Sequence, residues 1–171
     1  MIVAHALYLI SPAVAAGVVH GVVIKYDLLA LLARPIDGGV ELGGAPLFGA
    51  NKTWRGPIVM VGASSAAAAA FGLPVALGAC LGAAYSLAEL PNSFLKRRLG
   101  IAPGSRTRRR AVLQYIVDQG DSAAGCTLAL GLFVHTPELL AVTFAAGFAI
   151  HAIFDALLYA LGVKPLQEQP V

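Results

Sequence analysis

Long apolar stretches without charge alternate with short polar segments along this chain. The first covers residues 1–24, and a second, 56–88, is too long for one untilted span and contains the turn sequence Gly72-Leu73-Pro74. A helix needs about 20 predominantly apolar residues to cross a bilayer core of about 30 Å. The pattern predicts an all-α, polytopic integral membrane protein, a single domain over residues 1–171, with about five transmembrane helices near residues 2–24, 57–71, 75–95, 112–134 and 139–163.

Composition favours a membrane protein over a soluble domain. Apolar residues make up 58% of the chain and charged residues 12%, and the mean hydropathy is +0.77. A soluble domain carries about 25% charged residues because its surface must meet water. The net charge of +3 does not indicate a nucleic-acid partner, since no soluble body carries a basic face. Cys80 and Cys126 lie in apolar stretches and are expected to be packing residues.

The basic residues fall in three polar segments, which predicts the orientation of the chain. These segments follow the first, third and fifth expected helices and contain Lys25, Arg34, Lys52 and Arg55; Lys96, Arg97, Arg98, Arg106, Arg108, Arg109 and Arg110; and Lys164. With five helices the segments share one side of the membrane, which the positive-inside rule makes cytoplasmic. We therefore predict a multi-pass protein of the cytoplasmic membrane, with its N-terminus outside and its site on two cytoplasmic loops.

Three carboxylates are expected inside helices, near their cytoplasmic ends: Glu89, Asp118 and Asp121. Acidic groups there are costly and are therefore functional candidates. Asp118 and Asp121 are spaced i, i+3, which puts them on one helical face with their Cβ atoms about 5–6 Å apart. Such a pair suits Mg²⁺ shared with substrate phosphates, and salt bridges to neighbouring arginines are an equally good interpretation. His151 and Asp155, spaced i, i+4 on the fifth helix, are interpreted as a buried polar pair.

The third helix carries a polar stripe. Its members, at i, i+4, i+7 and i+8, are Glu89, Ser93, Lys96 and Arg97. Pro91 removes one backbone hydrogen bond and is expected to bend the helix near Glu89. The basic run 96–98 alone is also typical of an anchor that ends a span, or of a contact with anionic lipid.

The segment 49–56 is rich in hydrogen-bond donors. It is not a P-loop, because Asn51 stands where that motif needs a glycine before the lysine, and no strand precedes it. Lys52, Thr53 and Arg55 nevertheless offer donors beside an accessible backbone. This segment therefore suits phosphate oxygens.

Four motifs occur in one order along nearly the whole chain. They are Pro35-Ile36-Asp37-x-Gly39, Asn51-Lys52-Thr53-Trp54-Arg55-Gly56, Glu89-Leu90-x-x-Ser93-Phe94-x-Lys96-Arg97-Arg98-x-Gly100, and Asp118-Gln119-x-Asp121. In this order they resemble the CDP-archaeol synthase family, which is related to the phosphatidate cytidylyltransferases. The resemblance implies a five-helix membrane enzyme that transfers CMP from CTP to a lipid phosphate and releases pyrophosphate.

The resemblance also implies roles for individual residues. Glu89, Asp118 and Asp121 would hold Mg²⁺, and Asp118, Asp121 and Lys96 would be catalytic. Substrate binding is implied for the other polar residues of the motifs: Asn51, Lys52, Thr53, Arg55, Ser93, Arg97, Arg98 and Gln119. The implied partners are CTP, a lipid phosphate acceptor and membrane lipids, without nucleic acid. At Ala88-Glu89 the chain departs from the family, which usually has Gly-Asp.

The residue types suit such a reaction. The second pKa of a phosphate monoester is near 6, so the attacking oxygen is already largely ionised at pH 7 and needs no strong base. Positioning and charge neutralisation then supply the catalysis. The sequence leaves open whether the acceptor is an ether-linked isoprenoid glycerol phosphate or another polyprenyl or diacyl lipid phosphate. A relative that binds nucleotide or anionic lipid without turnover, and a small membrane transporter or structural protein, are the alternatives, and the oligomeric state is unknown.

Overall fold

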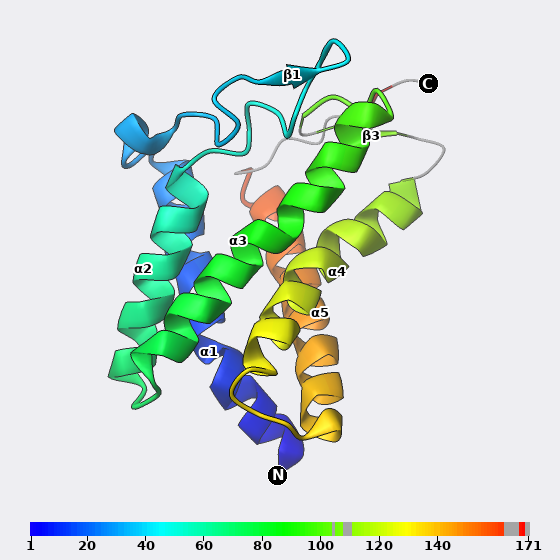
Figure 1. Ribbon diagram of the computed structural model, residues 1–171. Coiled ribbons are helices and arrows are strands. Elements are labelled where there is room, and N and C mark those ends of the chain that lie inside the picture. Colours follow the sequence, from blue (N-terminus) through cyan, green and yellow to red (C-terminus); the bar gives the residue numbers. More distant parts are fainter. Residues whose placement is uncertain (104, 108–110, 163–167, 170–171) are drawn as a thin grey trace.

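A computed structural model describes residues 1–103, 105–107, 111–162 and 168–169. Five helices dominate these residues, as Figure 1 shows, which confirms the predicted all-α class. They are α1 (Ile2–Lys25), α2 (Arg55–Ala70), α3 (Val75–Arg98), α4 (Ala111–Leu130) and α5 (Pro137–Ala160). Of the basic residues that predicted the orientation, Arg108, Arg109, Arg110 and Lys164 lie outside the described residues.

The helix ends follow local signals. Gly72 adopts a positive φ of 72° after α2, a conformation that glycine accepts without strain, and Pro74 precedes α3. The fourth helix ends four residues earlier than predicted, at Leu130, because the chain turns at Gly131. Pro91 lies inside α3, which continues to Arg98, three residues beyond its predicted end.

Small residues let α3 pack closely against its two neighbours. A Cβ atom at Gly78 would lie 2.3 Å from the Ser64 carbonyl oxygen of α2, and one at Gly82 would lie 2.4 Å from that of Met60. On the other side, a Cβ at Gly125 of α4 would lie 2.6 Å from the Ala84 carbonyl oxygen. The backbones of α2, α3 and α4 therefore approach closely at these glycines, and α3 is held between α2 and α4.

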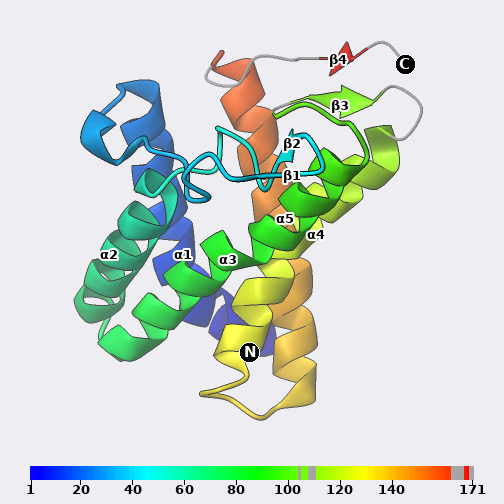
Figure 2. The ribbon, with the colours of Figure 1, turned by 45° about the horizontal axis from the view of Figure 1, so that its top comes forward.

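Loops cover one end of the bundle, opposite the N-terminus (Figures 1 and 2). The loop between α1 and α2 contains a 3₁₀ turn (Ala30–Leu32) and a short antiparallel hairpin of β1 (Glu41–Leu42) and β2 (Ala45–Pro46). Nearby, β3 (Arg106–Thr107) pairs in parallel with β4 (Glu168–Gln169). The Asp37 carboxylate accepts backbone hydrogen bonds from Gly39 (3.0 Å), Phe48 (2.9 Å) and Gly49 (3.3 Å), so it orders this loop.

Two of the described helices, α1 and α5, are long and apolar enough to cross a membrane, with mean hydropathies of 2.0 and 1.8. Only 17% of the apolar part of α5 is buried in the protein, so most of it faces outward. Large apolar side chains elsewhere, such as Leu128 and Leu132, are also largely exposed. These surfaces indicate a membrane protein, because burial in lipid removes them from water. Five spans remain a prediction, since α2 has only 16 residues.

Candidate active site

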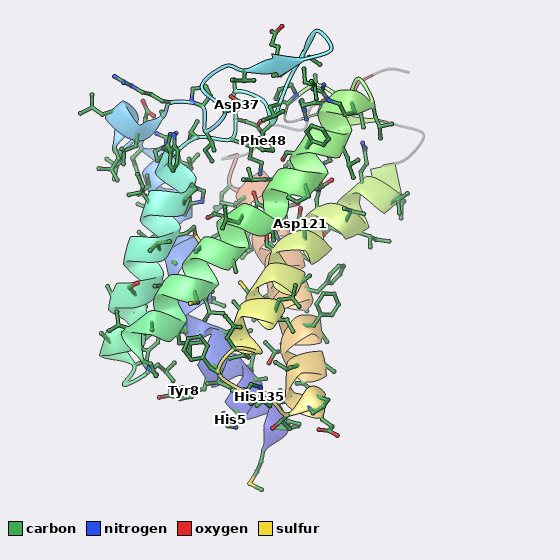
Figure 3. All side chains as sticks on the ribbon, viewed as in Figure 1. His5, Tyr8, Asp37, Phe48, Asp121 and His135 are labelled. Carbon is green, nitrogen blue, oxygen red and sulfur yellow. The ribbon has the colours of Figure 1, made fainter. Side chains whose placement is uncertain are left out.

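Two aspartates of α4 face α3, where one asparagine bridges them. Asn92 donates from Nδ2 to Asp118 Oδ1 (2.7 Å) and to Asp121 Oδ2 (2.9 Å). Figure 3 shows Asp121 between α3 and α4, closer to the loop containing Asp37 than to His135 at the opposite end. The i, i+3 spacing predicted that the two carboxylates share a face, and it did not predict the asparagine that joins them.

The third carboxylate, Glu89, lies against the same cluster. The Ser122 hydroxyl oxygen lies 3.1 Å from Glu89 Oε1 and 3.2 Å from Asp121 Oδ1, and the Ser122 backbone N–H donates to Asp121 Oδ1 over 2.6 Å. One hydroxyl of α4 therefore joins an α3 carboxylate to an α4 carboxylate. The three acidic side chains converge, and Ser122 is a second residue of the site that the sequence did not indicate.

Two lysines neutralise part of this acidic cluster. Lys52, from the loop before α2, forms an ion pair with Glu89, and Lys96, one turn after Asn92 on α3, forms one with Asp118. The alternative interpretation expected arginines beside the aspartates; among the described residues, Asp118 pairs with Lys96 instead. Burial alone lowers the pKa of Lys52, but the charge of Glu89 and the hydrogen bond to it outweigh burial and hold this pKa above its usual value. Lys52 is therefore positively charged at neutral pH.

The donor set suits a hard divalent cation. No group of three or more His, Cys, Asp or Glu side chains among the described residues is arranged to hold a metal ion directly. The oxygens of Asp118 and Asp121 are nevertheless the ligand type that Mg²⁺ prefers. In this structure both carboxylates accept hydrogen bonds from Asn92 Nδ2, over 2.7 and 2.9 Å. The carboxylates fit the ion chemically, and its binding would replace their contacts with Asn92, Lys52 and Lys96.

A cavity of about 300 Å³, with a mixed polar and apolar wall, opens on the Lys52 side of the cluster. Its wall combines α1, the start of α2, α3 and α5 with the loop segment Asn51, Lys52 and Thr53. Glu89 also lines it. Residues of two motifs that lie far apart in the sequence are therefore brought together around one cavity.

His151 links three helices beside this cavity. Its Nδ1 lies 3.3 Å from the Gln119 carbonyl oxygen, which only accepts hydrogen bonds, and its Nε2 lies 3.0 Å from the Tyr85 hydroxyl. Nδ1 therefore donates to the Gln119 carbonyl, and Nε2 shares a hydrogen bond with the Tyr85 hydroxyl. Gln119 Nε2 donates to the Asp155 carboxylate over 3.4 Å. In place of the expected local pairing of His151 with Asp155, both belong to a wider network across α3, α4 and α5.

Comparison with known proteins identifies the family. CDP-archaeol synthase of Halobacterium salinarum is 35% identical to this chain, over 77% of the chain and 81% of the relative. The synthase of Halorubrum lacusprofundi is 33% identical over 77% of the chain and 82% of the relative, and that of Hyperthermus butylicus is 31% identical over 92% and 91%. The chain belongs to the CDP-archaeol synthase family. No protein-family model and no solved structure matches it.

Two arginines that the resemblance to CDP-archaeol synthases assigned to phosphates bind the loops in this structure. The Arg98 guanidinium donates to the carbonyls of the β1–β2 hairpin, at Leu42, Ala45 (2.9 Å) and Pro46 (2.7 Å). Arg55 pairs with Asp27 over 2.6 Å. Both therefore shape the loop that presents Lys52, and their binding to phosphate remains a prediction.

The other residues assigned from the CDP-archaeol synthase motifs are buried close to the cluster. Ser93 and Arg97 follow Glu89 along α3 and are 8% and 6% exposed. Arg97 Nε lies 3.5 Å from the Ser93 carbonyl, and its buried Nη1 has no hydrogen-bond partner among the described residues. A buried, charged nitrogen without a hydrogen-bond partner is costly, so an anionic ligand at Nη1 would relieve that cost. Gln119, 2% exposed, turns away from the aspartates toward α5.

Proposed function

We propose that this protein is a CTP-dependent cytidylyltransferase that transfers CMP from CTP to a lipid phosphate, giving a CDP-lipid and pyrophosphate. Family membership carries this proposal, since relatives named CDP-archaeol synthase align over most of the chain. It favours the enzyme over a transporter or a relative without turnover. The convergence of Glu89, Asp118 and Asp121 beside Lys52 and Lys96 supports it, because the reaction needs concentrated charge more than it needs a nucleophilic side chain.

The proposed step is an attack by a phosphate oxygen of the lipid on the α-phosphorus of CTP. A new phosphorus–oxygen bond forms, the bond from the α-phosphorus to the bridging oxygen of the β-phosphate breaks, and pyrophosphate leaves with that electron pair. Lys52 and Lys96 exchange their carboxylate partners for phosphate oxygens and neutralise the charge that gathers there. A Mg²⁺ ion held by Asp118 and Asp121 with Glu89 would supply further charge neutralisation at the triphosphate.

We also propose that all five helices cross the cytoplasmic membrane, with the N-terminus outside. The described lysines and arginines support this orientation, because every one of them from Lys25 to Arg106 lies at or beyond the loop-bearing ends of the helices. The N-terminus and the α4–α5 turn with His135 lie at the other end (Figures 1 and 3). This arrangement opens the cavity beside Lys52 toward cytoplasmic CTP and keeps it within reach of lipids in the inner leaflet.

The test is an assay of purified protein with labelled CTP, Mg²⁺ and a panel of lipid phosphates that includes ether-linked isoprenoid and diacyl forms. We expect a labelled CDP-lipid with at least one acceptor. Asp121→Asn should lower the rate about a hundredfold or more, because it removes a charge that acts on the transferring group. Glu138→Gln, an exposed carboxylate at the opposite end of α5, is the matched control and should retain full activity. Absence of product with every acceptor would refute the proposed reaction.

A further inference from the structure

A cluster of exposed apolar side chains follows the end of α1. Tyr26, Leu28, Leu29 and Leu31 are all largely exposed, Leu31 to 85%, in a segment whose one charged residue is Asp27. This segment, residues 26–32, ends with the 3₁₀ turn, and we call it the 26–32 turn. The proposed reaction uses none of these side chains. Contiguous apolar surface of this kind is costly in water and marks a surface that another phase or molecule covers.

The backbone of the 26–32 turn directs these side chains away from the helix bundle. Asp27 and Leu29 adopt positive φ angles of 47° and 56°, which is rare for leucine. Between them, the Leu28 N–H donates to the Val23 carbonyl over 2.9 Å and closes α1. Arg55, from the start of α2, donates to the Asp27 carboxylate over 2.6 Å and to the Leu28 carbonyl over 3.3 Å. These contacts hold a strained conformation in which the leucines face outward.

The position of the turn identifies a lipid surface as its cover. The helix that precedes it, α1, is long and apolar enough to cross a membrane. Val18, Val22 and Tyr26 are exposed and spaced i, i+4, i+8, so the outward face of α1 runs directly into the turn. Figure 1 shows the turn at the side of the bundle, beside the loop-bearing ends of α1 and α2, whereas the β1–β2 hairpin lies beyond the end of the bundle. One lipid surface can therefore cover both α1 and the turn.

Residues that favour the membrane interface flank the turn. Lys25 Nζ lies 5.7 Å from the centre of the Tyr26 ring, and Arg34 follows two residues after the turn. Trp54, at the start of α2, is half exposed. Tyrosine and tryptophan concentrate at the level of the lipid headgroups, and long basic side chains reach the phosphates there. The leucines between them match the boundary between headgroups and acyl chains, where apolar side chains of an interfacial segment are buried.

We propose that the 26–32 turn inserts its leucines into the inner leaflet and anchors the loop that presents Lys52 to the membrane surface. This inference rests on the proposed crossing and orientation of α1. The segment that leaves the turn is paired with the Lys52 segment, because the Ile36 N–H donates to the Lys52 carbonyl over 2.8 Å and the Trp54 N–H donates to the Arg34 carbonyl over 3.0 Å. A turn fixed in lipid therefore also fixes the height of Lys52 relative to the membrane.

Single tryptophans measure the insertion. In a Trp54→Phe background, which removes the one tryptophan of the chain, Leu31→Trp reports on the turn, Val18→Trp on α1 and Leu42→Trp on the β1–β2 hairpin. All three positions are half exposed or more, so each accepts the larger side chain. The proteins are placed in nanodiscs of phosphatidylcholine that is brominated either near the headgroup or deep in the chains. Iodide in the buffer is the complementary, water-borne quencher.

We expect the fluorescence of Leu31→Trp to be quenched more by the shallow bromines than by the deep ones. Val18→Trp, about 10 Å deeper than the end of α1, should show the reverse order, and Leu42→Trp should be quenched by iodide alone. Leu31→Trp that is quenched by iodide alone, or shielded from both quenchers as it would be beneath a partner protein, would overturn the inference. Val18→Trp that neither bromine quenches would refute the membrane crossing of α1, and the inference with it.

Leu31→Asp tests the anchoring role, with Leu42→Asp, on the hairpin, as the matched control. Keeping one leucine side chain out of apolar surroundings shifts the equilibrium between the inserted and the free turn by about tenfold. Leu31→Asp should therefore raise the hydrogen-exchange rates of the Ile36 and Trp54 amides in nanodiscs by up to about tenfold, and Leu42→Asp should leave them at the wild-type rates. Equal rates in the wild type and Leu31→Asp would refute the anchoring of the Lys52 loop.

Discussion

Replacing Asn92 by aspartate exchanges the amide that bridges Asp118 and Asp121 for a further carboxylate of the same size. The wild-type amide donates to both Asp118 and Asp121, at 2.7 and 2.9 Å, and so separates two negative charges that share a helical face. Asn92→Asp removes both donors and brings a further negative charge against the pair. Lys96 then remains beside Asp118 as a source of compensation.

The expected cost follows from these contacts. A hydrogen bond to a charged group contributes about 1.5–3 kcal/mol, so losing two would cost about 3–6 kcal/mol. The side chains are only half-buried, which favours the lower figure of about 3 kcal/mol. For a protein of this size, each 1 kcal/mol shifts the melting temperature by about 2–4 °C. We therefore expect Asn92→Asp to melt about 10 °C below the wild type in EDTA.

Excess Mg²⁺ should reverse much of that loss. The new carboxylate adds an oxygen ligand beside Asp118 and Asp121, and a ligand at 100 times its Kd stabilises the folded state by about 2.7 kcal/mol. Asn92→Leu, which also lacks the donors but adds no oxygen, is the matched control and should gain less than the wild type. Thermal unfolding of each protein in EDTA and in MgCl₂ measures this. Asn92→Asp that melts like the wild type in EDTA, or ignores Mg²⁺, would show that Asn92 does not bridge a cation site.

Three further changes test the packing and the loop. Gly82→Ala should lower the free energy of unfolding by about 1–3 kcal/mol, because its Cβ would lie 2.4 Å from the Met60 carbonyl oxygen. Gly62→Ala, whose Cβ would meet open space, should not lower the free energy of unfolding. Thermal unfolding of the two variants measures the difference. Arg98→Ala removes the hydrogen bonds to three hairpin carbonyls, so a protease should cleave within residues 41–46 faster than in the wild type. Mass spectrometry of the fragments over time measures the cleavage rate. Backbone hydrogen bonds outweigh burial and hold the pKa of Asp37 below its usual value, so the order it gives the loop is present above about pH 4 and is lost as pH falls further. The protection of the Phe48 amide against hydrogen exchange, measured at several pH values, tests this loss of order. Asp37→Asn, which lacks the titrating group, is the comparison.

The sequence was sufficient for the helices and for the acidic residues of the site. Apolar runs closed by a charge or a glycine place helix ends within a few residues, since leaving apolar surface in water or ending a helix without a signal is costly. The i, i+3 spacing of Asp118 and Asp121 fixes a shared face by helix geometry alone. The cost of a carboxylate inside a membrane helix made Glu89 a functional candidate, and the resemblance to the CDP-archaeol synthase family predicted that it joins the two aspartates.

The partners of these carboxylates were not predictable, because they depend on how separate elements meet. Lys52 reaches Glu89 only through the path of the loop, and Asp37 orders that loop by contacts with residues two to twelve positions away. In the sequence, nothing distinguishes Asn92 and Ser122 from other polar residues of the helices. Each becomes part of the site only at the observed register of α3 against α4.

That register is set by a glycine, which connects packing to chemistry. Gly125 follows Asp121 by one helical turn, and its Cβ would lie 2.5 Å from the Cβ of Ala88, the residue before Glu89. Close approach of the two backbones at this point therefore brings the two carboxylates to a common hydroxyl, that of Ser122. A larger residue at Gly125 would separate α3 from α4 where the acidic groups meet, since packed helices cannot yield there without moving apart. The small residues of α3 and α4, which have no chemistry of their own, thus determine the distance on which a shared cation between Glu89 and Asp121 would depend.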